Sequence, residues 1–341
     1  MPLFTPSLKQ SGHLEQISIT ICNIGSRKLS TQDDYGSSGW HIFAPNLTIL
    51  GVDADADACE EANEELARRN INWQEKHLPI ALAKSRGEKT LYVTKHPMCS
   101  SLYPPNEDFL NRFQQLPEFA NLDFTFDLET TTLDQLCQQE NIPSIDFLQI
   151  DVQGADLDVL QGGLEILSRS VLVIQIEVEF SPLYLEQPLF ADIDKFLRQQ
   201  SFSLFHLATS HRVRRISPIQ SRKQGQILWG EAYYYRDLIA PDLSADFLSL
   251  KTPEQILKLA CIADVMDFTD YAVELLAYLT VNCGQDKNYN FADNIIEVLS
   301  QFPELIKQGL ANLEIFQILK DFLSPEAENF WKHLNFQRFQ R

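Results

Sequence analysis

The sequence of 341 residues lacks several patterns that mark common classes of protein. Its six cysteines are far apart, with no Cys-x-x-Cys pair and no neighbouring pair of histidines, which argues against a zinc site. No apolar run is long and unbroken enough to span a membrane, and the amino terminus has no apolar segment typical of a secretion signal. The sequence therefore predicts free thiols, no membrane span and a cytoplasmic location.

Basic residues are also scarce. Acidic residues number 47 against 28 lysines and arginines, which gives a formal net charge of −19. A surface of this charge repels phosphate backbones and anionic lipid headgroups, so nucleic acid is not an expected partner. Hydrophobic residues make up 44% of the chain, which is enough for the core of one large α/β domain with an appended module.

The stretch at residues 144–163 is the most informative part of the chain. Its first half, from Ile145 to Val152, is a short apolar run typical of a strand buried on both faces, and its second half spaces leucines as a helix does. Asp151 follows at the strand's carboxyl end, and Gly154 lies in the turn. Open α/β sheets place their ligand crevice here, and glycine lets the backbone approach a bound molecule. A structural alternative stays open, because acids at strand ends often only cap the next helix.

The sequence of this stretch, Ile-Asp-Phe-Leu-Gln-Ile-Asp-Val-Gln-Gly-Ala-Asp-Leu-Asp-Val-Leu-Gln-Gly-Gly, resembles the signature of the FkbM family of S-adenosylmethionine-dependent methyltransferases. The resemblance continues at 178–184 and 226–232 and extends over about residues 17–236. It implies an α/β fold with the seven-stranded Rossmann-like sheet of class I methyltransferases, whose last strand is antiparallel. It also implies S-adenosyl-L-methionine as the cofactor, and methylation of a hydroxyl on a small molecule, a glycan or a lipid-linked acceptor.

Two strand ends carry residues that the resemblance assigns to the cofactor. The run at 17–22 leads into a loop with Gly25, and the run at 47–53 ends in Asp53, whose carboxylate suits both ribose hydroxyls. The family's loop usually follows an Asp and holds a second glycine, whereas this chain has Asn23 and a single glycine. The expected cofactor contacts are Asn23, Gly25, Ser26, Arg27, Asp53, Ala54, Ala81, Leu82, Asp151, Val152, Gln153 and Gly154.

Carboxylates on the following strand are candidates for the chemistry. The run at 171–180 alternates so that Gln175, Glu177 and Glu179 share one face, which is costly in a buried strand unless that face borders a cavity. Desolvation and mutual repulsion should raise the pKa of at least one glutamate toward neutrality, as a general base requires. The expected catalytic residues are Glu177, Glu179 and Asp151, and we expect transfer to need no metal.

The predicted domains are a lead-in at 1–16, an FkbM-like cofactor-binding domain at 17–238 and a helical C-terminal module at 239–341. A helix of this module is predicted to begin at Thr252–Gln255, where a capping box and a proline in the first turn are typical of a helix start. No nucleophile or metal constellation is evident in it. We interpret these helices as a protein-binding or dimerising appendix.

Three other functions stay open. A metal-dependent O-methyltransferase normally has an Asp-Asn pair after the fifth strand, where this chain has Phe180-Ser-Pro. A catalytically inactive methyltransferase fold that serves as a binding or scaffold protein is favoured by Asn23 and disfavoured by the retained Asp53 and Asp151. A nicotinamide-dependent dehydrogenase is disfavoured because the chain has no Gly-x-Gly-x-x-Gly motif.

Overall fold

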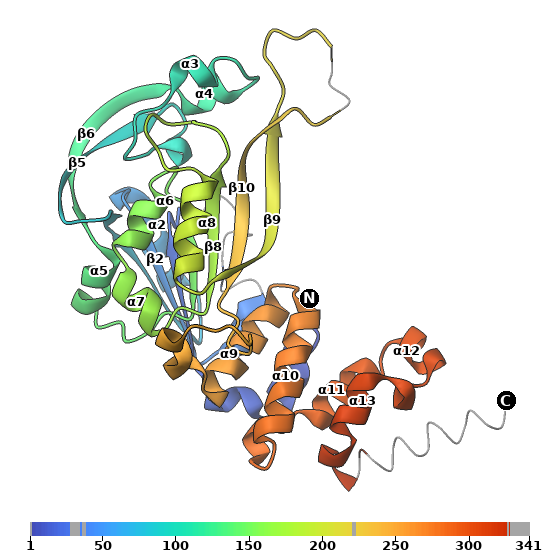
Figure 1. Ribbon diagram of the computed structural model, residues 1–341. Helices are drawn as coiled ribbons and strands as arrows, with labels where there is room; N and C mark the ends of the chain where they lie inside the picture. The colour runs from blue at the N-terminus through green and yellow to red at the C-terminus, as the bar shows by residue number, and fades with distance from the viewer. Residues whose placement is uncertain (1, 28–34, 36–38, 220–222, 326, 328–341) are drawn as a thin grey trace. The chain divides into compact units, whose positions relative to one another are not determined.

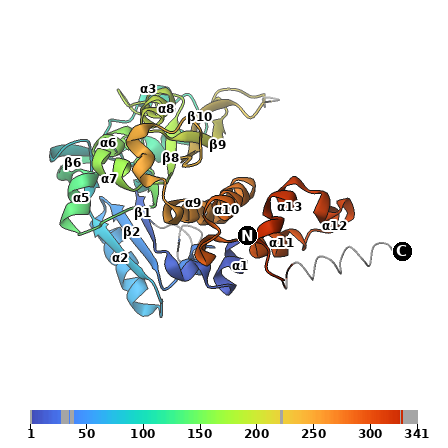
Figure 2. The ribbon, with the colours of Figure 1, turned by 60° about the horizontal axis from the view of Figure 1, so that its bottom comes forward.

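The structure is a computed structural model that describes residues 2–27, 35, 39–219, 223–325 and 327. The chain divides into two compact units. The sheet unit comprises Ile19–Asp34 and Leu47–Asp237, and the helical unit comprises Met1–Ser18, Tyr35–Asn46 and Leu238–Arg341. Figures 1 and 2 show the strands and helices of each unit. Among the described residues, no helix combines the length and the apolar character that crossing a membrane requires.

The sheet unit is built on seven strands in the order β3-β2-β1-β7-β8-β10-β9. Strand β10 is antiparallel to both of its neighbours, and the other adjacent strands are parallel. This arrangement confirms the predicted seven-stranded Rossmann-like class I methyltransferase sheet with an antiparallel last strand. The bounds are β1 Ile19–Ile24, β2 Leu47–Asp53, β3 Gln74–Pro79, β7 Phe147–Ile150, β8 Val173–Glu179, β9 Ser203–Arg212 and β10 Gln226–Tyr235.

Helices cover one face of the central strands. Ile174 and Ile176 of β8 belong to the same buried cluster as Leu160 of α6, Leu167 of α7 and Leu197 of α8. Burial of each such side chain contributes about 1.5–3 kcal/mol, so this layer fixes the strand ends at which a ligand crevice is expected. Figure 1 shows α6 and α8 lying along the sheet. The helices of this unit are α2 Ala56–Arg68, α3 Glu107–Leu110, α4 Leu116–Ala120, α5 Leu133–Gln139, α6 Asp156–Gln161, α7 Leu164–Arg169 and α8 Phe190–Gln199.

A second, three-stranded sheet belongs to the same unit. It consists of β4 Ala81–Leu82, β6 Leu122–Thr131 and β5 Gly87–Thr94, in that order. Strand β4 is parallel to β6, and β5 is antiparallel to it. Because β4 follows β3 after a single residue, the small sheet begins at the edge where the large sheet ends.

The helical unit is formed by segments from both ends of the chain. The helix start predicted at Thr252 is confirmed, since the Thr252 hydroxyl accepts a hydrogen bond from the backbone N–H of Gln255 at 3.2 Å. The α-helices are α1 Thr5–Gln10, α9 Pro253–Val265, α10 Thr269–Cys283, α11 Ala292–Leu299, α12 Pro303–Gln308 and α13 Glu314–Leu319. The 3₁₀ helices of this unit are η1 His13–Gln16, η4 Gly39–Phe43, η6 Ala245–Leu250, η7 Lys287–Tyr289, η8 Leu310–Asn312 and η9 Lys320–Phe322.

Residues 1–16 differ from the predicted lead-in, because they contain α1 and η1 and bury Phe4 and Leu8. The cause is a buried acid more than 250 positions away in sequence. The carboxylate of Asp264 in α9 accepts hydrogen bonds at 2.9, 2.9 and 2.8 Å from the backbone N–H groups of Leu3, Phe4 and Thr5. Asp264 therefore caps α1 from another helix, and no local pattern in the sequence reveals such a cap.

We expect Asp264→Ala to destabilise the helical unit by about 2–3 kcal/mol, because three backbone N–H groups and the Thr5 hydroxyl lose their buried acceptor. Amide hydrogen exchange should report the loss as reduced protection of α1. Asp242→Ala removes an exposed acid of the same unit and serves as the control. Unchanged protection of α1 in the Asp264 variant would contradict the assigned cap.

Candidate functional site

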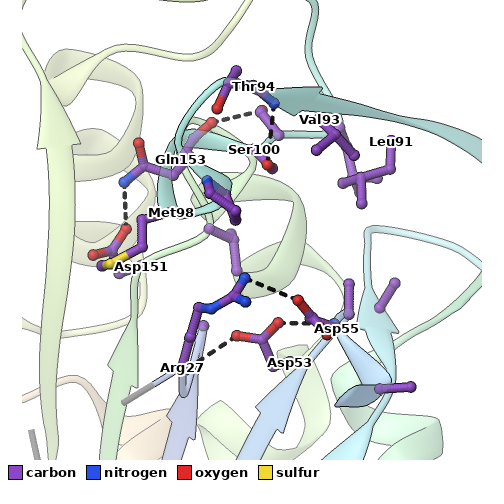
Figure 3. A pocket seen from close by; sticks show the side chains of 18 of the residues that line it. Arg27, Asp53, Asp55, Leu91, Val93, Thr94, Met98, Ser100, Asp151 and Gln153 are labelled. Atoms are coloured by element: carbon purple, nitrogen blue, oxygen red, sulfur yellow. Dashed lines mark hydrogen bonds and ion pairs between the residues drawn. The ribbon is translucent and has the colours of Figure 1, made fainter. Parts of the chain in front are cut away.

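A cavity of about 580 Å³ lies at the carboxyl ends of β1, β2 and β7 (Figure 3). It brings together most of the predicted cofactor contacts from segments that are far apart in the sequence. The predicted contacts in its lining are Gly25, Arg27, Asp53, Ala54, Ala81, Leu82, Asp151, Val152 and Gln153. The predicted contacts Asn23, Ser26 and Gly154 are not part of the lining.

Gly25 occupies a position at which the backbone excludes any side chain. Its φ is +82°, and a Cβ atom built on it would lie 1.9 Å from the backbone oxygen of Asp151. The N–H groups of Gly25 and Ser26 both donate to the carbonyl oxygen of Val52, at 2.8 and 3.1 Å. The single glycine of this loop therefore lets β1, β2 and β7 approach each other closely at the cavity.

The three predicted contacts outside the lining have other surroundings. The Ser26 hydroxyl is buried and lies 3.3 Å from Nδ1 of His77. The Oδ1 atom of Asn23 is buried and has no hydrogen-bond partner among the described residues. Gly154 has a φ of +89°, and a Cβ atom there would approach the side chain of Gln187 to 2.9 Å.

Asp53 lies at the end of β2 and is held by backbone donors. Its carboxylate accepts hydrogen bonds from the N–H of Asp55 at 2.9 Å and from the N–H of Arg27 at 3.1 Å. Burial raises the pKa of Asp53, and these hydrogen bonds oppose the rise. Asp55 caps α2 by accepting a hydrogen bond from the N–H of Ala58, and it also pairs with the Arg27 guanidinium at 2.9 Å.

Gln153 links two of the predicted catalytic carboxylates. Its Nε2 atom donates to Asp151 at 2.7 Å and to Glu177 at 2.6 Å, and its φ of +56° is unusual for a residue with a side chain. The Tyr184 hydroxyl lies 2.8 Å from Oε1 of Gln153, and the Ser101 hydroxyl donates to the Gln153 carbonyl at 2.6 Å. Sequence reasoning missed the roles of Tyr184 and Ser101, although Tyr184 lies inside the quoted family motif.

Four carboxyl groups gather at the ends of β7 and β8. Burial, reinforced by the charge of Asp151, raises the pKa of Asp156 to about 7 and that of Glu177 well above its usual range. Burial also raises the pKa of Asp151, opposed by the hydrogen bond from Gln153. Burial and the charge of Asp156 raise the pKa of Glu179 well above its usual range. The cluster therefore holds protons more strongly than exposed carboxyl groups do.

The predicted catalytic residues differ in whether they line a cavity. Asp151 lines the large cavity and also a second cavity of about 280 Å³, which Glu177 and Glu231 line as well. Glu179 is 1% exposed and lines neither cavity. Its carboxylate oxygens have no hydrogen-bond partner among the described residues. Asp151 and Glu177 are therefore the members of the predicted set that a ligand could reach.

A family model described as the methyltransferase FkbM domain matches residues 30–204, just over half of the 341 residues. The chain belongs to the FkbM methyltransferase family. One curated relative of this family member is the 2-O-methyltransferase NoeI of Sinorhizobium fredii (strain NBRC 101917 / NGR234). The two proteins are 37% identical over 78 residues, which make up 23% of this chain and 32% of that protein. The chain thus spans about a third of the length of the curated relative that it matches.

Several solved structures are similar to part of this chain. The methyltransferase FkbM from Methylobacillus flagellatus KT matches at 10% identity and a TM-score of 0.36, over 64% of this chain and 44% of that chain. The magnesium protoporphyrin IX methyltransferase ChlM from Synechocystis PCC 6803, crystallised with bound SAH, matches at 12% identity and a TM-score of 0.32, over 68% of this chain and 80% of that chain.

The raised pKa of Glu179 predicts a pH-dependent penalty on the stability of this FkbM family member. Above about pH 4.3 the folded form keeps the proton of Glu179, whereas the unfolded form has lost it. The free energy of unfolding therefore falls as pH rises from about 4.3 to the pKa of Glu179 in the folded form. We expect Glu179→Gln, which cannot ionise, to become more stable relative to the wild type as pH increases from 5 to 8, by up to about 1.4 kcal/mol per pH unit. Urea unfolding at each pH measures the difference.

Glu129→Gln makes the same substitution at an exposed glutamate of β6 and is the control. A difference between Glu179→Gln and the wild type that is constant with pH, or that shrinks as pH rises, would contradict the assigned protonation.

Proposed function

We propose that this chain transfers a methyl group from S-adenosyl-L-methionine to a hydroxyl of a small-molecule, glycan or lipid-linked acceptor. The observation that carries the proposal is the cluster of Asp151, Asp156, Glu177 and Glu179 beside a cavity with a ribose-type acid, Asp53. Gln153 and backbone N–H groups donate hydrogen bonds to the cluster, and these donors are neutral. A cationic ligand would compensate this charge, and S-adenosylmethionine is cationic at its sulfur.

The residues in the cavity suit the parts of this cofactor. Two backbone N–H groups orient the carboxylate of Asp53. Its remaining lone pairs can accept hydrogen bonds from two ribose hydroxyls. Ala81 and Leu82 offer an apolar surface for the adenine, and the Gly25 loop would hold the methionine end. When bound, the cofactor supplies an electrophilic methyl group on a positively charged sulfur.

In this proposal the chain's own residues position the acceptor and remove its proton. Asp151 reaches both cavities and shares the amide of Gln153 with Glu177, so either carboxylate can accept the hydroxyl proton while the other stays hydrogen-bonded. Their raised pKa values make both groups stronger bases than exposed carboxylates when they are ionised. Since Glu179 lines neither cavity, we assign it an electrostatic role and do not propose it as the base. We propose that methyl transfer requires no metal.

Other features support the finer parts of the proposal. The relative NoeI is a 2-O-methyltransferase, which favours oxygen as the accepting atom here. All six cysteines are free, which favours a reducing compartment such as the cytoplasm. The helical unit, which holds the C-terminal helices, is proposed as a protein-binding or dimerising module.

The decisive experiment measures transfer of a radiolabelled methyl group from S-adenosylmethionine to a panel of sugars, glycolipids and hydroxylated aromatic compounds. We expect transfer by the wild type in the presence of EDTA. We expect Glu177→Gln or Asp151→Asn to reduce turnover about a hundredfold or more without loss of folding, because a general base contributes about 10²–10⁴-fold. Glu129→Gln is the matched control and should be fully active.

Two results would contradict this function. Activity that EDTA abolishes and magnesium restores would favour the metal-dependent mechanism. Absence of both cofactor binding and transfer in the folded wild type would favour an inactive fold that acts as a binding or scaffold protein, which the single glycine of the Gly25 loop also suggests.

A further inference from the structure

One face of the three-stranded sheet is apolar although it is not buried. Strand register places Leu91 opposite Phe126 and Val93 opposite Phe124, so these four side chains share one face. Phe124 and Phe126 are 53% and 45% exposed, and their stacked rings have centroids 6.3 Å apart. Two large exposed rings stacked together are a common mark of a binding surface.

This apolar face is continuous with the proposed cofactor site. All four side chains line the same cavity of about 580 Å³ as Asp53 and Asp151. Figure 3 shows Leu91 and Val93 at one side of the cavity and Asp151 and Gln153 at another. A single ligand space therefore has a polar part at the ends of the large sheet and an apolar part on the small sheet.

The phenylalanines lie beyond the expected reach of the adenine. Ala81, the proposed adenine contact, pairs with Thr130 of β6. Phe126 and Phe124 precede Thr130 by four and six positions, which corresponds to roughly 13 and 20 Å along a strand. An adenine held at Ala81 would leave these rings to another ligand.

We propose that Phe124 and Phe126 bind an apolar part of the methyl acceptor, an aromatic ring system or an acyl chain, while its hydroxyl is directed toward Asp151. The proposal rests on the proposed methyl transfer and adds the chemical class of the acceptor. Acids outnumber bases in the lining of the cavity, so the acceptor should carry no negative charge. The acids are Asp53, Asp55, Asp57, Asp123 and Asp151, and the bases are Arg27 and Lys95.

The test uses N-phenyl-1-naphthylamine, a neutral apolar dye, and S-adenosylhomocysteine as the cofactor product. We expect the dye to bind the wild type in the presence of saturating S-adenosylhomocysteine. We expect the double variant Phe124→Ser and Phe126→Ser to raise the Kd of the dye at least about tenfold and to change the Kd of S-adenosylhomocysteine less than twofold. Retained S-adenosylhomocysteine binding shows that the variant is folded.

Phe119→Ser is the matched control, because Phe119 is also 45% exposed but does not line the cavity. It should leave dye binding unchanged. Displacement of the dye by S-adenosylhomocysteine would overturn the proposal, since the rings would then serve the cofactor, and so would unchanged dye binding in the double variant. Failure of S-adenosylhomocysteine to bind the wild type would instead overturn the proposed function on which this assignment rests.

Discussion

The burial of four carboxyl groups at the ends of β7 and β8 is the constraint on which the site depends. Asp156 and Glu179 are fully buried, and Asp151 and Glu177 are partly buried beside them. A carboxylate that loses its hydration needs a proton, a cation or several hydrogen bonds. Here neutral donors supply some hydrogen bonds, and the rest of the cost appears as raised pKa values. Such a cluster responds strongly to a positive charge in the adjoining cavity.

Backbone geometry couples this cluster to the proposed cofactor loop. Gly25 lies against the backbone carbonyl of Asp151, so the loop after β1 packs directly on the backbone at the end of β7. Gln153, two residues further along, adopts a left-handed conformation that costs about 1–3 kcal/mol in a residue with a side chain. Ser101 and Tyr184 hold it there, and its amide thereby reaches both Asp151 and Glu177. Strain of this kind is consistent with a functional position.

The sequence alone predicted the features that depend on local pattern. Apolar runs located four strands of the large sheet, β1, β2, β7 and β8. The acids at the ends of two of these runs, Asp53 and Asp151, line the cavity. The same patterns could not separate neighbours that point to different sides of a strand end, so Ser26 was expected in the cavity but is buried against His77. Local pattern also could not distinguish Glu177, which borders a cavity, from Glu179, which does not.

Other features depend on contacts between distant residues. The hydrogen bond from the Thr5 N–H to Asp264 holds an amino-terminal segment that the sequence predicts only as a lead-in. The apolar face of the small sheet arises from the register between β5 and β6, and neither strand alone indicates it. Strand register and side-chain direction are set by tertiary packing, which a single sequence does not specify.

The most direct test of the central claim compares the affinities of S-adenosylmethionine and S-adenosylhomocysteine for the wild type between pH 5 and 8. The two ligands differ in the methyl group and the positive charge that it places on the sulfur, so the ratio of their Kd values isolates the response of the site to that charge. Because the carboxyl groups have raised pKa values, they should lose protons as pH rises and attract the cation more strongly. We predict that the preference for S-adenosylmethionine grows at least about tenfold over this range and that Glu177→Gln weakens the trend. A ratio that does not change with pH would contradict the claim that this cluster is matched to a cationic cofactor.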